Sequence, residues 1–334
     1  MTAPLLELRA VSKRFKRSLS LGDRVAAKLG SVVETREVRA VESVSLTIAQ
    51  GETLGLVGES GCGKSTLGRI AAGILPPSEG EALLGGEPVM SGGSRPRKLT
   101  TRVQTVFQDP FASLNPRRRV GDTIAEGPIT HGLVDRTGSR AYVADWLKRV
   151  GMDPSYADRY PHQFSGGQRQ RIAVARALAM RPDLLICDEP VASLDVSIQA
   201  QVLNLFLELR RALNLTALFI SHDLGVVRHV SDRVAIMYLG RVVELGPTST
   251  IYAAPKHPYT QALLASVPRL KRRREERHGF KPIAGELPSA LSPPPGCHFH
   301  PRCPAAEARC KVEAPLLRRA GDGQSAACHL VPEI

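Results

Sequence analysis

A glycine-rich stretch that contains one lysine, residues 58–66, is the part of this sequence best suited to chemistry. It follows an apolar run, 53–57, and precedes a helix-like run, 67–72. Glycines let successive backbone N–H groups turn toward an anion, and a helix N-terminus adds partial positive charge there. Such a P-loop binds a nucleoside triphosphate and its magnesium ion. The expected contacts come from Gly58, Ser60, Gly61, Cys62, Gly63, Lys64, Ser65 and Thr66.

An acidic pair, Asp188 and Glu189, ends the apolar run 184–187. A carboxylate at this place is the expected second holder of magnesium, usually through water, and we assign this part to Asp188. Glu189 is then placed to polarise the water that attacks the γ-phosphate. An acid pair exposed at a strand end is the alternative, but the P-loop favours the catalytic interpretation.

Strand-like and helix-like runs alternate along most of the chain. We expect strands at 5–11, 41–48, 53–57, 81–84, 102–107, 184–187, 216–220, 233–238 and 241–245. Helical periodicity at 120–131 and 139–150 predicts a helical insertion over about 110–162. The alternation predicts an α/β fold with a largely parallel sheet, covered on both faces, that binds ligands at the carboxyl ends of its strands.

Together these motifs resemble the ATP-binding subunits of ABC transporters over about residues 5–265. The resemblance rests on the run Phe164-Ser165-Gly166-Gly167-Gln168 before a helical segment, with the acidic pair downstream. Phe164 stands where leucine is usual. The resemblance implies a P-loop NTPase cassette with an antiparallel β subdomain and a helical subdomain. The nucleotide-binding domain is then expected at 1–250 and a C-terminal extension at 251–334.

The resemblance also implies roles for single residues. Phe15 matches an aromatic residue that stacks on adenine, and Gln108 matches a glutamine that senses magnesium and the γ-phosphate. Asp195 belongs to a loop that crosses the interface of two cassettes, and His222 matches a histidine that contacts the γ-phosphate. The implied catalytic set is Lys64, Gln108, Glu189 and His222, and the implied magnesium set is Ser65, Gln108 and Asp188.

The signature residues are expected to act between two chains. In the resembled family, this segment closes on the ATP that is bound to the other subunit. One cassette alone should therefore hydrolyse ATP slowly, and this chain should pair with a second copy or a paralogue. The signature contacts to ATP are expected from Ser165, Gly166, Gly167 and Gln168.

A narrower resemblance, to the ATPases of oligopeptide and dipeptide importers, covers the runs 107–116, 194–201, 257–260 and 296–299. It implies ATP-driven import of peptides or related small solutes. The implied partners are a second ATPase subunit, two transmembrane permease subunits and an external solute-binding protein. No run approaches the roughly 20 apolar residues that cross a bilayer. We therefore expect the chain at the cytoplasmic face of the membrane, held there by its partners.

Four of the six cysteines, Cys297, Cys303, Cys310 and Cys328, lie near the end of the sequence. Four thiolates suit either zinc or an iron–sulfur cluster, and their spacing alone does not choose between them. The narrower resemblance implies a [4Fe–4S] cluster, with zinc as the alternative, in a structural role. Neighbouring ligands of lower rank are His298, His300 and His329, and four reduced cysteines in an unstructured tail remain the other alternative.

The net charge of +13 raises the question of nucleic acid binding. Aromatic residues make up only 4% of the chain, however, so stacking platforms for single strands are not evident. A solvated basic face, or one near anionic lipid, explains the charge better, and no nucleic acid partner is expected. Two other hypotheses remain: a nucleic-acid-linked ATPase on the same cassette, and a redox sensor based on the cysteine tail.

Overall fold

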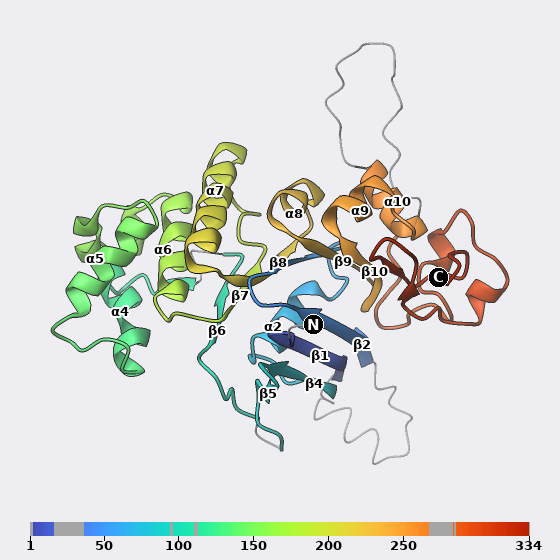
Figure 1. Ribbon diagram of the computed structural model, residues 1–334, viewed down its shortest axis with the longest axis horizontal. Helices are drawn as coiled ribbons and strands as arrows, with labels where there is room; N and C mark the ends of the chain where they lie inside the picture. Colours follow the sequence, from blue (N-terminus) through green and yellow to red (C-terminus); the bar gives the residue numbers. More distant parts are fainter. Residues whose placement is uncertain are drawn as a thin grey trace, which may run out of the picture.

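Two β-sheets and the helices around them make up the structure, a computed structural model (Figure 1). It describes residues 3–16, 37–93, 96–109, 113–266, 283 and 285–333. The first three residues of the predicted helical insertion, 110–112, lie outside this part of the chain. Among the described residues, no helix combines the length and apolar character needed to cross a bilayer.

Buried parallel strands form the centre of the main sheet. β3 (Thr53–Val57), β7 (Leu184–Asp188) and β8 (Thr216–Ser221) are buried along their whole length, as expected where helices cover both faces. In the described part of the chain, the strand order is β11-β12-β10-β9-β3-β8-β7-β6. The run from β9 to β6 is parallel, whereas β10 to β12 are antiparallel. The other strands are β6 (Val103–Val106), β9 (Arg233–Tyr238), β10 (Arg241–Pro247), β11 (Arg318–Arg319) and β12 (Ser325–Ala326).

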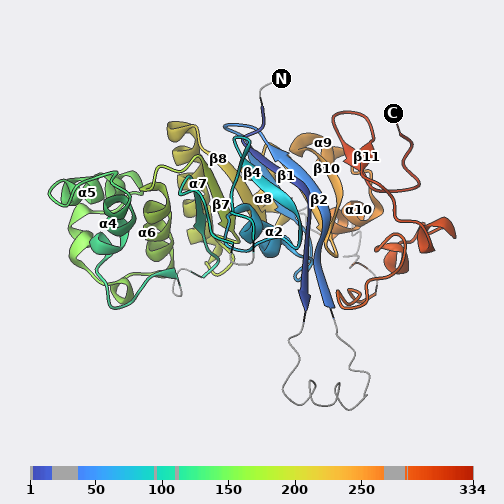
Figure 2. The same ribbon diagram turned by 90° about the horizontal axis from the view of Figure 1, so that it is seen from below.

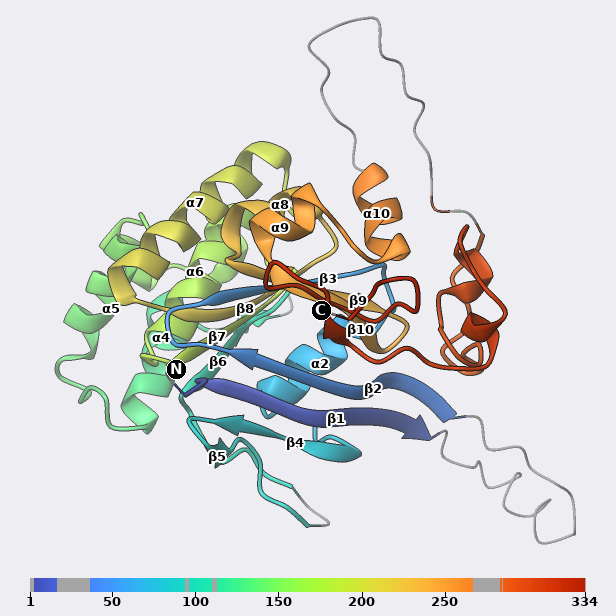
Figure 3. The same cartoon turned by 45° about the vertical axis from the view of Figure 1, so that its right-hand side comes forward.

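A second, antiparallel sheet lies beside the main one, in the order β2-β1-β4-β5 (Figure 3). Its strands are β1 (Leu6–Lys16), β2 (Glu37–Ile48), β4 (Glu79–Leu84) and β5 (Glu87–Pro88). β1 is longer than predicted, so that Phe15 lies on the strand. Helix α2 (Lys64–Ala71) contacts strands of both sheets, and its Leu67 and Ile70 belong to the apolar core between them. The antiparallel β subdomain is thus present.

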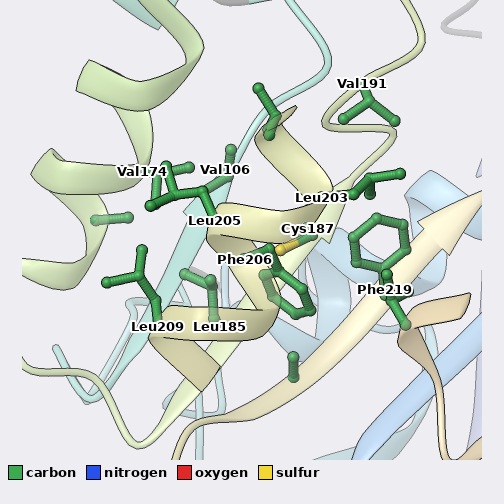
Figure 4. Close-up of a cluster of buried hydrophobic side chains, with 14 of the residues drawn as sticks. Val106, Val174, Leu185, Cys187, Val191, Leu203, Leu205, Phe206, Leu209 and Phe219 are labelled. Carbon is green, nitrogen blue, oxygen red and sulfur yellow. The ribbon is translucent and has the colours of Figure 1, made fainter. Parts of the chain in front are cut away.

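The predicted helices of the insertion also form. α4 (Val120–Thr130), α5 (Ser139–Arg149) and α6 (Gly166–Leu178) pack together at the green end of the molecule (Figure 1). α7 (Val196–Leu213) places an apolar face against the sheet. Figure 4 shows this core, in which Phe206 of α7 meets Phe219 of β8 with ring centroids 5.4 Å apart.

The C-terminal segment adds to the main sheet. Its last strand, β12, pairs with β10 through Glu244–Ala326 and Leu245–Ser325. The red segment therefore lies against the edge of the main sheet (Figure 2). The two-residue strands of this segment are too short to show periodicity in the sequence. The remaining helices and turns are α8 (Leu224–Val230), α9 (Thr248–Ala253), α10 (Pro258–Ala265) and the 3₁₀ turns Pro154–Asp158, Pro161–Gln163, His300–Arg302 and Arg309–Lys311.

Candidate functional site

The glycine-rich loop forms a close-packed turn between β3 and α2. α2 begins at Lys64, three residues earlier than predicted, because Gly63 caps it with a φ of 108°. A Cβ on Gly63 would lie 2.1 Å from the carbonyl oxygen of Ala40, and one on Gly58 would lie 2.1 Å from that of Met237. Glycine is therefore required at both positions. At Gly61, by contrast, a Cβ would meet no atom within 4 Å, so the loop is open on this side.

Lys64 and Ser65 lie at the start of α2, where backbone N–H groups have no helical partner. The Lys64 side chain is buried, and its Nζ donates to the carbonyl oxygens of Gly58 (2.8 Å) and Glu59 (3.0 Å). The Ser65 hydroxyl donates to Oδ1 of Asp188 at 2.8 Å, and burial raises the pKa of that carboxyl. The fold thus brings together the loop lysine and two of the predicted magnesium ligands.

Three of the predicted catalytic side chains meet at one carboxylate. Oε2 of Glu189 accepts from Nε2 of Gln108 at 3.2 Å and from Nδ1 of His222 at 3.1 Å. The three residues follow β7, β6 and β8, neighbouring strands of the main sheet. Glu189 also has a φ of 48°, and its N–H donates to the carbonyl of Ile220 at 3.0 Å. Its carboxylate is 14% exposed and held from two sides, which is the geometry of an oriented general base.

The signature segment forms a second helix N-terminus. Ser165 caps α6 by accepting from the N–H of Gln168 at 3.4 Å, and the Gln168 side chain accepts from the N–H of Ser165 at 3.1 Å. Gly167 packs on α7, since a Cβ there would lie 2.3 Å from Cγ2 of Ile198. Ser165 itself is exposed. α6 lies apart from α2 in all three views, so this chain does not bring its own signature to its P-loop (Figures 1 to 3).

The remaining predicted contacts lie outside the cluster around Glu189. Asp195 occupies the N-cap position of α7, and the next residue, Val196, is 83% exposed. Phe15 is 41% exposed on β1, and the Lys13 ammonium lies 5.4 Å from its ring centroid. Of the other loop positions, Ser60 is exposed, Thr66 is half-buried, and Cys62 is buried, which raises the pKa of its thiol.

Four thiols converge in the C-terminal segment. Cys297, Cys303, Cys310 and Cys328 all line one small cavity beside Phe299. The N–H of Cys297 donates to the carbonyl of Cys310 at 2.9 Å, which ties two of these loops together. Burial raises the pKa of the thiols of Cys297, Cys303 and Cys328. The described residues nevertheless contain no group of three or more His, Cys, Asp or Glu side chains placed to hold a metal ion.

Each of the three nearby histidines hydrogen-bonds a backbone carbonyl through one ring nitrogen. His298 contacts Leu239 (3.0 Å), His300 contacts Cys297 (2.9 Å), and His329 contacts Glu313 (2.9 Å). His300 and His329 line the cavity of the four thiols. The buried His298 instead has its Nε2 3.7 Å from a carboxylate oxygen of Glu42.

One contact to the P-loop was missed in the sequence. Arg302, in the turn between Cys297 and Cys303, forms a bidentate ion pair with Glu59 of the loop at 2.7 and 3.0 Å. The two residues are 243 positions apart, so no local pattern predicts their pairing. The run 257–260, noted above only for its resemblance, supplies Tyr259, whose hydroxyl accepts from the N–H of Glu59 at 3.0 Å.

Two family models match the chain. The first, described as "ABC transporter", matches residues 41–192. The second, described as "Oligopeptide/dipeptide transporter, C-terminal region", matches residues 243–310. The first match covers the P-loop, the signature segment, Asp188 and Glu189, and the second covers Arg302 with three of the clustered cysteines.

The chain is also similar to curated proteins over almost its whole length. It is 49% identical over 328 residues to the oligopeptide transport ATP-binding protein AppF of Bacillus subtilis (strain 168), covering 98% of this chain and 97% of that one. It is 46% identical over 303 residues to the dipeptide transport ATP-binding protein DppF of Haemophilus influenzae, covering 90% and 92%. Among solved structures, the ATP-binding cassette MJ0796, a dimer with ADP and Pi, matches with a TM-score of 0.59 at 26% identity, covering 73% and 98%.

Proposed function

The chain belongs to the ABC transporter family, among the oligopeptide and dipeptide transport ATP-binding proteins, and we propose that it hydrolyses ATP to power the import of peptides or related small solutes. One observation carries the catalytic part of this proposal. The Glu189 carboxylate is held by Gln108 and His222 beside a P-loop whose Ser65 contacts Asp188. The peptide part rests on the identity to peptide transport ATPases over nearly the full chain.

In the proposed mechanism, the P-loop N–H groups and Lys64 hold the triphosphate. The Lys64 ammonium exchanges its two carbonyl acceptors for phosphate oxygens when ATP binds. Ser65, Asp188 and Gln108 would hold a magnesium ion through their oxygen atoms, directly or through water, and such an ion would supply positive charge next to the phosphates. The residues fit this ion because a hydroxyl and a carboxylate already lie 2.8 Å apart at the loop. Phe15 stacks on the adenine.

Glu189 acts as the base that orients and deprotonates the attacking water. Nδ1 of His222 lies 3.1 Å from this carboxylate, so a contact with the γ-phosphate would come from Nε2, which must carry a proton there because phosphate oxygens only accept. Gln108 donates to the same oxygen, so a displacement of Gln108 would also move the base. The three side chains therefore link the state of the nucleotide to the position of the segment around Gln108.

The complete ATP site is proposed to need two cassettes. The signature set Ser165, Gly166, Gly167 and Gln168 is exposed or half-buried except for the packed Gly167, and the N-terminus of α6 suits an anion. Asp195, at the N-cap of α7, and the exposed Val196 after it are proposed to face the second cassette. The dimeric state of the similar cassette bound to ADP and Pi supports the arrangement. The second subunit is a further copy of this chain or a paralogue.

The other proposed partners are two permease subunits and an external solute-binding protein. A cavity beside Gln108 offers a docking place for the permease, since it lies between the sheet and the helical insertion. Its lining combines apolar and charged side chains, among them Ile74, Phe107, Ile124, Glu126 and Arg176. We propose that the chain sits at the cytoplasmic face of the membrane through this contact and binds no nucleic acid.

We further infer that the nucleotide-binding domain spans residues 1–250, with its helical subdomain at about 110–162, and that the C-terminal extension spans residues 251–334. We also propose that this extension holds a metal group. Tetrahedral zinc at a Zn–S length of about 2.3 Å needs sulfurs about 3.8 Å apart. A [4Fe–4S] cluster takes one thiolate per iron, and the cavity that all four thiols line supports this group. The ligands would be Cys297, Cys303, Cys310 and Cys328.

Anaerobic purification followed by iron, sulfide and zinc analysis tests this cluster. About four irons and four sulfides per chain are expected. Cys303→Ser should lose them, and Cys62→Ser, at a buried cysteine outside the cavity, should keep them. Stoichiometric zinc would establish the alternative, and the absence of any metal would leave four reduced thiols.

The function itself is tested by purifying the chain with the membrane subunits that accompany it and reconstituting them in vesicles with their binding protein. Peptides should stimulate ATP hydrolysis and accumulate inside the vesicles. Stimulation by DNA or RNA, without any response to peptides, would instead favour the nucleic-acid-linked ATPase.

A further inference from the structure

The P-loop residue Glu59 is held from three directions. Its carboxylate pairs with Arg302 through both oxygens, at 2.7 and 3.0 Å. Its N–H donates to the hydroxyl of Tyr259 at 3.0 Å, and its carbonyl oxygen accepts from Nζ of Lys64 at 3.0 Å. Two of these three contacts come from the C-terminal part of the chain. Glu59 therefore connects that part to the lysine that is expected to bind phosphate.

The partners of Glu59 are themselves fixed by packing. The Arg302 side chain is 5% exposed, and its Nη1 also lies 3.4 Å from the hydroxyl of Tyr238. Tyr238, Tyr259 and Phe299 are fully buried against one another, with ring centroids 4.6 to 5.4 Å apart. Phe299 precedes the turn that carries Arg302. A guanidinium held this firmly is a rigid support for the loop, because its two parallel hydrogen bonds fix both the distance to the Glu59 carboxylate and the plane in which that carboxylate lies.

Charge gives the contact a second role. Glu59 places a carboxylate next to a loop that must accept a polyanion. Its side chain is only 26% exposed, so water screens this charge incompletely. Arg302 is the cation that pairs with both carboxylate oxygens. Without that pairing, an uncompensated negative charge would oppose the phosphates of the nucleotide.

We propose that the C-terminal extension is a working part of the nucleotide site, in which Arg302 is a positioning residue that holds the P-loop through Glu59 and neutralises its carboxylate. The inference rests on the proposal that residues 58–66 bind ATP. Residues 243–310, which contain Arg302, would then contribute to nucleotide binding by the cassette. Arg302 directly precedes Cys303, so a displacement of the turn His300–Arg302 would also displace the contact to Glu59.

The test measures binding of the fluorescent analogue MANT-ATP, with magnesium, to the full-length chain. Arg302→Gln should raise the dissociation constant by roughly tenfold, as an uncompensated charge near an anion implies. Arg302→Lys keeps the charge but loses the paired hydrogen bonds, so its dissociation constant should lie between those of the wild-type chain and of Arg302→Gln. The double variant Glu59→Gln/Arg302→Gln removes both charges and should also recover to within about threefold.

Two controls separate the explanations. Arg309→Gln removes a bidentate arginine pair of the same extension, with Glu313 at 2.8 and 2.9 Å, and should leave MANT-ATP affinity unchanged. Lys64→Ala should abolish binding, and if it does not, the P-loop assignment has failed rather than this inference. A thermal unfolding midpoint for each variant identifies loss of fold.

The inference is overturned if Arg302→Gln binds within twofold of wild type while Lys64→Ala does not bind. It is also overturned if the double variant binds as weakly as Arg302→Gln, since charge compensation would then play no part. Should Arg302→Gln fail to fold, Arg302→Lys and the double variant are compared with wild type instead. A tenfold loss of MANT-ATP affinity in both would contradict the proposal that Arg302 acts by neutralising the Glu59 carboxylate.

Discussion

Replacing Glu189 by glutamine tests the catalytic arrangement most directly. The amide has nearly the shape of the carboxylate, and its oxygen can take the place of Oε2 and accept both hydrogen bonds, from Gln108 and from His222. The stability of the fold should therefore change by no more than about 1 kcal/mol. What the amide removes is the ability to take a proton from the attacking water. ATP binding should persist, and the chemical step should not.

The expected loss of the hydrolysis rate follows from the proposed role of Glu189 as a general base. Positioned general bases contribute about 10²- to 10⁴-fold, which corresponds to about 2.7 to 5.4 kcal/mol in the barrier. Phosphate release by Glu189→Gln should fall by that factor, while the dissociation constant for MANT-ATP stays within about threefold, because Lys64, Ser65 and the loop N–H groups are untouched. With hydrolysis blocked and binding intact, a closed dimer should accumulate in ATP.

The measurements are phosphate release and light scattering after size exclusion, each with ATP and with ADP. Glu208→Gln is the matched control, since Glu208 is an exposed glutamate on α7. It should behave as wild type in every assay. If Glu189→Gln hydrolysed ATP at more than half the wild-type rate, the base would have to be another group, and the contacts of Gln108 and His222 would have only a structural meaning.

Two further predictions concern the signature and the C-terminal helix. Gly167→Ala places a methyl group 2.3 Å from Cγ2 of Ile198 and should lower the free energy of unfolding in urea by about 1 to 3 kcal/mol. The double variant Gly167→Ala/Ile198→Ala should recover part of this loss. An unchanged unfolding midpoint in Gly167→Ala would contradict the close packing of α6 on α7. Burial lowers the pKa of His257 to about 4, so that below pH 6.5 the unfolded chain binds a proton that the folded chain does not, and stability should fall by up to about 3 kcal/mol between pH 6.5 and 4. His257→Asn, which still accepts from the N–H of Tyr259, should flatten that decline in urea unfolding curves, and an unchanged slope would contradict a buried neutral histidine.

The sequence identified the local parts of the site well, because each of them depends on neighbours in the chain. Gly58, Gly63 and Lys64 form a loop between a strand and a helix, and the apolar run before Asp188 indicates a buried strand. The ABC cassette fold that these motifs predict is confirmed by the family match and by the similar solved structure. The roles of the single side chains in catalysis stay predictions.

Which distant residues meet can be seen only in the folded chain. Sheet order brings Gln108, Glu189 and His222 to one carboxylate, and strand order is a matter of non-local pairing that no local period encodes. The contact between Glu59 and Arg302 is a second example of a pairing that local sequence patterns do not predict. Composition and local spacing can be read from the sequence, and they are enough to predict the P-loop. Which arginine holds the loop is determined by how the chain packs across 243 residues, because an ion pair depends on distance in space.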